Sequence, residues 1–128
     1  MSRFTYSAAH LVIERVSSED IEVLRVRGDV DIYTGPLLER AIAESPSGQT
    51  VIVDFSACPY LDCAAIAVLI RARKKLGPEL RLVVPADAQI RRIFSIVRLD
   101  SVLRIETSIE AIRCNGHLEN IGQGNRDD

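Results

Sequence analysis

The sequence predicts an α/β fold in which a mixed β-sheet of about five strands packs against about four α-helices. Two adjacent segments near the start have strand periodicity. After them, short β-branched apolar runs alternate with segments whose apolar residues recur at helical spacing. Adjacent strands imply antiparallel pairing, whereas alternation with helices implies parallel pairing through right-handed crossovers. The expected order is strand, strand, helix, strand, helix, strand, helix, strand, helix.

The first two strands are expected at residues 10–16 and 21–27. The earlier segment is rich in apolar side chains, and the later one places Glu22, Arg25 and Arg27 between apolar residues. Four polar residues separate them, which suits a turn. This pattern is typical of a β-hairpin with one face in solvent.

The first helix is expected to follow Thr34, whose hydroxyl can accept a hydrogen bond from a free backbone N–H. Gly35 and Pro36 fit its first turn, where proline costs little. Residues 50–55 are β-branched and nearly all apolar, which is typical of a strand buried on both faces.

Asp62 is the expected N-cap of the second helix, which the Gly77-Pro78 pair ends. A strand is expected at residues 80–84. The last elements are a third helix capped by Asp87, with its apolar stripe at 90, 93, 94 and 97, a short strand at 103–105, and a helix capped by Thr107 or Ser108.

One domain is therefore expected over residues 1–114. Residues 115–128 are polar and glycine-rich, without an aromatic side chain, and are expected to be disordered.

Composition narrows the function classes. The 128 residues include 16 Lys and Arg against 18 Asp and Glu, a balance that argues against a strongly cationic nucleic-acid binder. The first ten residues lack the apolar region of a signal peptide, and no run of about 18 apolar residues exists for membrane insertion. A cytoplasmic location is expected.

Three segments together resemble the STAS domain family: Gly-Asp-Val-Asp-x-x-Thr at 28–34, Val-Ile-Val-Asp-Phe-Ser at 51–56 with Tyr-Leu-Asp at 60–62, and Ile-Arg-Arg-Ile-Phe at 90–94. The resemblance covers roughly residues 10–113. It implies a STAS-type fold and the anti-sigma factor antagonist (anti-anti-sigma) class. Such proteins are not enzymes. They bind an anti-sigma factor with a kinase-like fold, and this releases a sigma factor and regulates transcription.

The resemblance also implies a partner surface. In that class the turn after the central strand reads Asp-Ser-(Ser/Thr)-Gly, and phosphorylation of the first Ser abolishes binding. A protein kinase of this type needs an alcohol, which the matching turn here lacks. The usual phosphorylation switch is therefore expected to be absent. The implied partner-binding residues are Asp31, Thr34, Asp62, Cys63, Ala64 and Ala65.

Three interpretations of Cys63 stay open. It is a small structural residue, a redox-regulated thiol that could pair with Cys58, or a nucleophile. Catalysis is disfavoured because the only histidines, His10 and His117, lie near the chain ends. With Cys114 the cysteines number three, which without an export signal suggests free thiols. No metal-ligand spacing or glycine-rich phosphate loop occurs, so neither a metal nor a cofactor is expected.

Two further alternatives concern partners and the acidic loop. The chain could instead be a structural STAS subunit of a lipid-transport ABC complex or of a stress-signalling assembly, and a homodimer is possible. Asp29 and Asp31 are either acidic site residues or caps of the loop before the first helix.

Overall fold

A computed structural model describes residues 2–46, 48–96, 98 and 103–112. Its elements are β1 (Ser2–Ala8), β2 (Leu11–Ser17), β3 (Ile21–Gly28), α1 (Gly35–Ala43), β4 (Thr50–Ala57), α2 (Cys63–Leu76), the short 3₁₀-helix η1 (Gly77–Glu79), β5 (Leu80–Val83), α3 (Arg91–Ile96) and β6 (Arg104–Glu106). Residues 109–112 are also helical.

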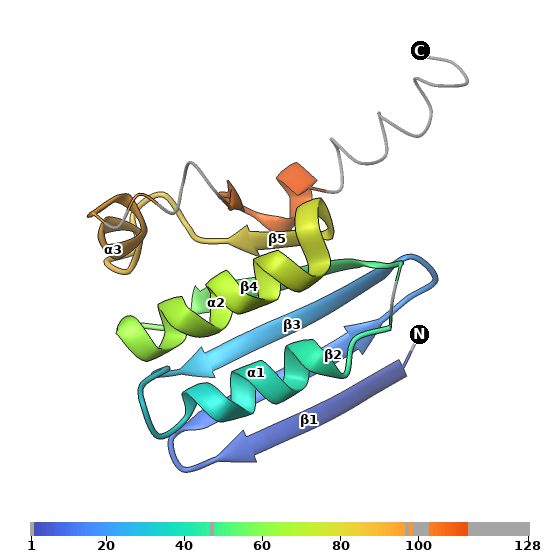
Figure 1. Cartoon of the computed structure of the whole chain (residues 1–128), viewed down its shortest axis with the longest axis horizontal. Helices are drawn as coiled ribbons and strands as arrows, with labels where there is room; N and C mark the ends of the chain where they lie inside the picture. Colours follow the sequence, from blue (N-terminus) through green and yellow to red (C-terminus); the bar gives the residue numbers. More distant parts are fainter. Residues whose placement is uncertain (1, 47, 97, 99–102, 113–128) are drawn as a thin grey trace.

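The six strands form one sheet in the order β1-β2-β3-β4-β5-β6. The β1–β2 and β2–β3 pairs are antiparallel, and the pairs from β3 to β6 are parallel. Helices α1 and α2 lie side by side on one face, with their N-termini at the same end of the sheet (Figure 1). The predicted mixed sheet is thus confirmed.

The main core lies between the sheet and these helices. The central strand β4 has buried residues on both faces, as predicted. Val51, Val53 and Phe55 belong to the main core, whereas Ile52 packs on the opposite face with Val23, Val83 and Ile112. The helical residues 109–112 therefore cover part of the second face.

The sheet has one strand more than the sequence predicted. Strand β1 pairs with β2 from Ser2 opposite Ser17 to Ala8 opposite Leu11. Phe4 and Tyr6 alternate with polar residues, and the Tyr6 side chain is buried. This short alternation fits an edge strand that is half covered.

The prediction that Glu22 faces solvent is wrong. Glu22 lies on the helix-covered face of β3 with Leu24 and Val26, and its carboxylate is buried. Arg15 Nη1 donates to Glu22 Oε1 at 2.6 Å. A charge on this face is tolerated because a buried partner neutralises it.

Arg15 has further partners that satisfy its guanidinium. It donates to the Tyr6 hydroxyl at 2.7 Å and to the carbonyl oxygen of Ala41. The Tyr6 hydroxyl donates to Glu44 Oε1 at 2.6 Å. Burial, together with the hydrogen bond to Glu44, raises the pKa of Tyr6 above its ordinary value. The network joins β1, β2 and β3 to the C-terminal half of α1.

The C-terminal third departs from the expected boundaries. Asp87 caps no helix, because residues 86–90 form successive turns and α3 begins only at Arg91. Ser108 does cap the last helix, since its hydroxyl accepts a hydrogen bond from Ala111 N at 3.1 Å. Strand β6 lies one residue later than expected. The expected tail, residues 115–128, lies outside the described residues, as does stripe position 97.

Within the described part of the chain, none of the helices has the length and apolar character needed to cross a membrane.

Candidate functional site

Two loops meet where β3 and β4 end. Beyond these strands, Val30 and Leu61 form an isolated parallel bridge. Val30 N donates to the Tyr60 carbonyl at 3.0 Å, and Asp62 N donates to the Val30 carbonyl at 3.2 Å. The β3–α1 loop, with Asp31 and Thr34, is thereby held beside the β4–α2 loop that leads into residues 62–65.

The two helix N-termini also touch. A Cβ built on Gly35, the first residue of α1, would lie 3.8 Å from Ala64 Cβ and 3.9 Å from Val68 Cγ2 of α2. The sequence-predicted residues of both loops therefore lie within one small region of the surface.

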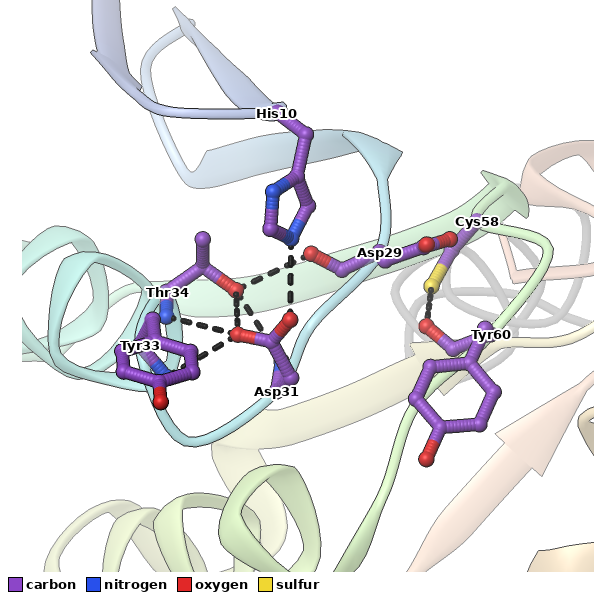
Figure 2. Close-up of polar contacts among 7 residues, drawn as sticks. All are labelled: His10, Asp29, Asp31, Tyr33, Thr34, Cys58 and Tyr60. Atoms are coloured by element: carbon purple, nitrogen blue, oxygen red, sulfur yellow. Dashed lines mark hydrogen bonds and ion pairs between the residues drawn. The ribbon is translucent and has the colours of Figure 1, made fainter.

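Asp31 caps the loop before α1, one of its two predicted roles (Figure 2). Its Oδ1 accepts hydrogen bonds from Tyr33 N at 2.9 Å and Thr34 N at 3.0 Å, and its Oδ2 lies 2.9 Å from His10 Nε2. Partial desolvation disfavours the charged form. The hydrogen bonds from Thr34, Tyr33 and His10 outweigh that effect and hold the pKa of Asp31 below its ordinary value.

The prediction that the Thr34 hydroxyl caps α1 is wrong. The Thr34 hydroxyl accepts from Asp31 N at 3.0 Å instead of from an N–H of α1, and it lies 3.0 Å from the Asp29 carbonyl oxygen. Its side chain is fully buried. Thr34 thus fixes the loop from within.

The predicted cap of α2 is confirmed. Asp62 Oδ1 accepts from Ala64 N at 2.9 Å, and the helix begins at Cys63. The Cys63 side chain is exposed, Ala64 is exposed in part, and Ala65 is buried in the core. The accessible part of this turn therefore consists of Asp62, Cys63 and Ala64.

The two described cysteines are free thiols in different surroundings. Cys58 is buried, and its Sγ donates to the Tyr60 carbonyl at 3.2 Å. Burial raises the pKa of Cys58 to about 11, so this thiol is almost wholly protonated near neutral pH. Cys63 is exposed. Cys114 and His117 lie outside the described residues.

No metal centre is present among the residues that the structure describes, which contain no suitable group of three His, Cys, Asp or Glu side chains. The histidine of this region, His10, comes from the β1–β2 turn and bonds to Asp31.

Three exposed apolar side chains in the two loops were not predicted to belong to the site. Ile32 is 69%, Tyr33 83% and Tyr60 50% exposed. All three residues stand near Asp, Gly or Pro in predicted loops, where no helix or strand periodicity assigns an apolar side chain to the core. That signal could have identified them. We call these residues the apolar trio.

Comparison with known proteins identifies the family to which this chain belongs. The STAS domain family model matches residues 12–112. The chain belongs to the STAS domain family, which confirms the resemblance found in the sequence.

The chain is similar to several known proteins. The chain is 26% identical to the anti-sigma-F factor antagonist RsfB of Mycobacterium tuberculosis over 92 residues, 70% of this chain and 75% of that protein. It is similar to the crystal structure of an anti-sigma factor antagonist from Mycobacterium paratuberculosis, with TM-score 0.66, 26% identity and coverage of 86% and 90% of the two chains. A Thermotoga maritima structure at 16% identity shares the fold, with TM-score 0.68 and coverage of 79% and 91%.

Proposed function

We propose that this chain is an anti-sigma factor antagonist: a non-enzymatic protein that binds an anti-sigma factor in the cytoplasm and so releases a sigma factor for transcription. The observation that carries the proposal is the Val30–Leu61 bridge, which joins the loops at the N-termini of α1 and α2 into one surface. The names of the two mycobacterial relatives support it.

The partner in this proposal is an anti-sigma factor with a kinase-like fold. Asp62, Cys63 and Ala64 are accessible to it. Thr34 and Ala65, which the resemblance also assigns to the surface, are buried: Thr34 hydrogen-bonds within its loop and Ala65 packs in the core.

Binding in this proposal is not switched by phosphorylation at the α2 N-terminus. A phosphate there would add about two negative charges beside free backbone N–H groups and would repel or block a partner that docks at this turn. Residues 63–65 are Cys, Ala and Ala, and none of them has a hydroxyl.

Redox control is a separate hypothesis. The exposure of Cys63 favours oxidation at that position. The burial and raised pKa of Cys58 disfavour it as the second thiol of a disulfide. Oxidation of Cys63 without Cys58 is therefore the form of the hypothesis that these surroundings support.

A binding measurement tests the proposal. Each anti-sigma factor of the source organism is titrated with the full chain by calorimetry, in reductant and in oxidant. We expect one of them to bind, and we expect Cys63→Glu to weaken binding at least about tenfold because it adds charge at a desolvated contact. Lys74→Gln is the matched control, since it makes the same change of net charge at the exposed far end of α2. After incubation with ATP, mass spectrometry should find residues 63–65 unphosphorylated.

The absence of binding to any anti-sigma factor in either condition would overturn the proposed function. Equal effects of the Cys63 and Lys74 variants would show that the contact lies elsewhere on the molecule.

A further inference from the structure

The apolar trio stands out among the exposed side chains. Within the described residues, five large apolar side chains are at least half exposed, and three of them, Ile32, Tyr33 and Tyr60, lie in the two bridged loops. Exposed apolar side chains are unfavourable in water by about 25 cal/mol per Å² relative to burial, and groups of them mark sites of association. Tyrosine is among the residue types that dominate binding energy at protein interfaces.

The main chain that carries the trio is held before any partner arrives. Tyr33 N donates to Asp31 Oδ1, and the Tyr60 carbonyl accepts from both Val30 N and Cys58 Sγ. Figure 2 shows Tyr33 and Tyr60 on either side of Asp31. A partner that docks here does not have to order these loops, so less of the contact free energy is lost on binding.

Asp31, by contrast, has little capacity left for a partner. Its Oδ1 has donors in Tyr33 N and Thr34 N, with the Thr34 hydroxyl 3.1 Å away, and its Oδ2 is occupied by His10. A cation on a partner would have to displace His10 to reach this carboxylate. Asp31 is therefore a positioning residue that holds the loop carrying Ile32 and Tyr33.

Charge distinguishes between possible occupants. Besides the occupied Asp31, the two loops carry the carboxylates of Asp29 and Asp62, and they contain no Lys or Arg. A two-fold dimer through this surface would bring the carboxylates of both copies together, which is unfavourable. A different protein with an apolar pocket and cations at its rim matches both the trio and the charge.

We propose that Ile32, Tyr33 and Tyr60 are the main binding determinants of this surface, and that they insert into an apolar pocket, bordered by Lys or Arg, on the anti-sigma factor. This inference rests on the proposed function and assigns the source of its affinity. Asp31 and His10 act indirectly, through the position of the loop.

The first test compares alanine variants in the same calorimetric titration with the anti-sigma factor that binds the wild-type chain. Tyr33→Ala and Tyr60→Ala should each weaken binding at least about 30-fold, and Ile32→Ala about tenfold, as expected of interface hot spots. Phe4→Ala is the matched control, because it removes another exposed aromatic ring on β1, away from the loops. Since the three side chains are exposed, circular dichroism should show unchanged folding.

The second test separates positioning from direct charge contact at Asp31. Asp31→Asn keeps an oxygen that accepts from Tyr33 N and Thr34 N but removes the charge, whereas Asp31→Ala removes both. We expect the Asn variant to bind within about threefold of wild type and the Ala variant at least about tenfold more weakly, because asparagine caps as well as aspartate. An equal loss in both variants would overturn the positioning role.

The outcomes separate this inference from the proposed function. If the wild-type chain binds no anti-sigma factor, both fail. If it binds and the trio variants bind equally well, only the present inference fails. If ultracentrifugation shows a wild-type dimer that Tyr33→Ala dissociates, the occupant is a second copy and the inference is overturned.

Discussion

Val30 and Leu61 form a parallel β-bridge just beyond the ends of β3 and β4, and this bridge fixes the relative position of the two site loops. The bridge follows a register shift in the β3–β4 pairing between Arg25 and Arg27. Pairing thus resumes after an irregularity, as at a β-bulge that redirects a strand end. The loops before α1 and α2 are consequently parts of one rigid surface.

Gly28, at the end of β3, is predicted to be required for full stability of the fold. Its φ is +110°, and a Cβ there would overlap the His10 carbonyl oxygen. We expect Gly28→Ala to lower the free energy of unfolding by about 1–3 kcal/mol for the backbone conformation and by a similar amount for the overlap. Urea denaturation measures this loss.

Gly48→Ala is the control for that measurement. Gly48 also has a positive φ, +82°, but a Cβ there has no neighbour within 4 Å. The control should therefore lose only the contribution of the backbone conformation. Equal losses in the two variants would contradict a steric role for the contact between Gly28 and the β1–β2 turn.

Local signals explain what could be predicted from the sequence. Helix α2 begins and ends where Asp62 and the Gly77-Pro78 pair predict, because a cap and a stop act through neighbouring backbone groups. The β-branched residues of β4 likewise predict a buried strand. The Asp62-Cys63-Ala64-Ala65 turn was identified only through the family resemblance.

Long-range contacts explain what could not be predicted. Asp31 and Thr34 both carry a side-chain oxygen that could accept from the free N–H groups before α1. Which of them does so depends on hydrogen bonds within the loop and on His10 from a distant turn. The burial of Glu22 requires the β2–β3 register that places Arg15 beside it. Sequence periodicity contains neither the register nor the loop contacts.

The buried pair Arg15–Glu22 is predicted to make a large contribution to stability only as an intact pair. Glu22→Ala leaves the Arg15 guanidinium buried beside Tyr6 and Ala41, and we expect a loss of about 3–5 kcal/mol. The double variant Arg15→Met, Glu22→Leu should lose less than Glu22→Ala alone, because it leaves no unpaired charge. Urea denaturation of the three chains provides the comparison.

The exposed pair Arg3–Glu14, at 3.1 Å, is the control for the buried one. Arg3→Ala should change the free energy of unfolding by less than about 1 kcal/mol, as is usual for ion pairs in solvent. A similarly small effect of Glu22→Ala would contradict the buried network.

Asp31 is predicted to contribute a pH-dependent part of the stability. Its pKa is lower in the folded chain than its ordinary value of about 4, so the folded state favours the carboxylate. The contribution is present above that ordinary value and is lost as the pH falls through the folded pKa. The stability difference between wild type and Asp31→Asn should therefore change as the pH falls from about 5 to 3, in the direction of a weaker wild type. Urea denaturation at each pH tests this, and a difference that does not vary down to pH 3 would contradict it.

Cys63 is predicted to react with an alkylating reagent at least about 100-fold faster than Cys58, because the thiolate is the reactive form and access is also required. Cys58 is buried with a pKa of about 11, whereas Cys63 is exposed at the start of α2. Mass spectrometry of peptides after timed alkylation at pH 7.5, in a Cys114→Ser background, gives both rates. In denaturing urea the two thiols should react alike, which controls for intrinsic differences.

The prediction fails if the two rates are comparable in the folded chain, or if mild oxidation forms a Cys58–Cys63 disulfide. Either result would show that the Cys58 loop opens readily. Redox control through the Cys58–Cys63 pair would then be a better hypothesis than oxidation of Cys63 without Cys58.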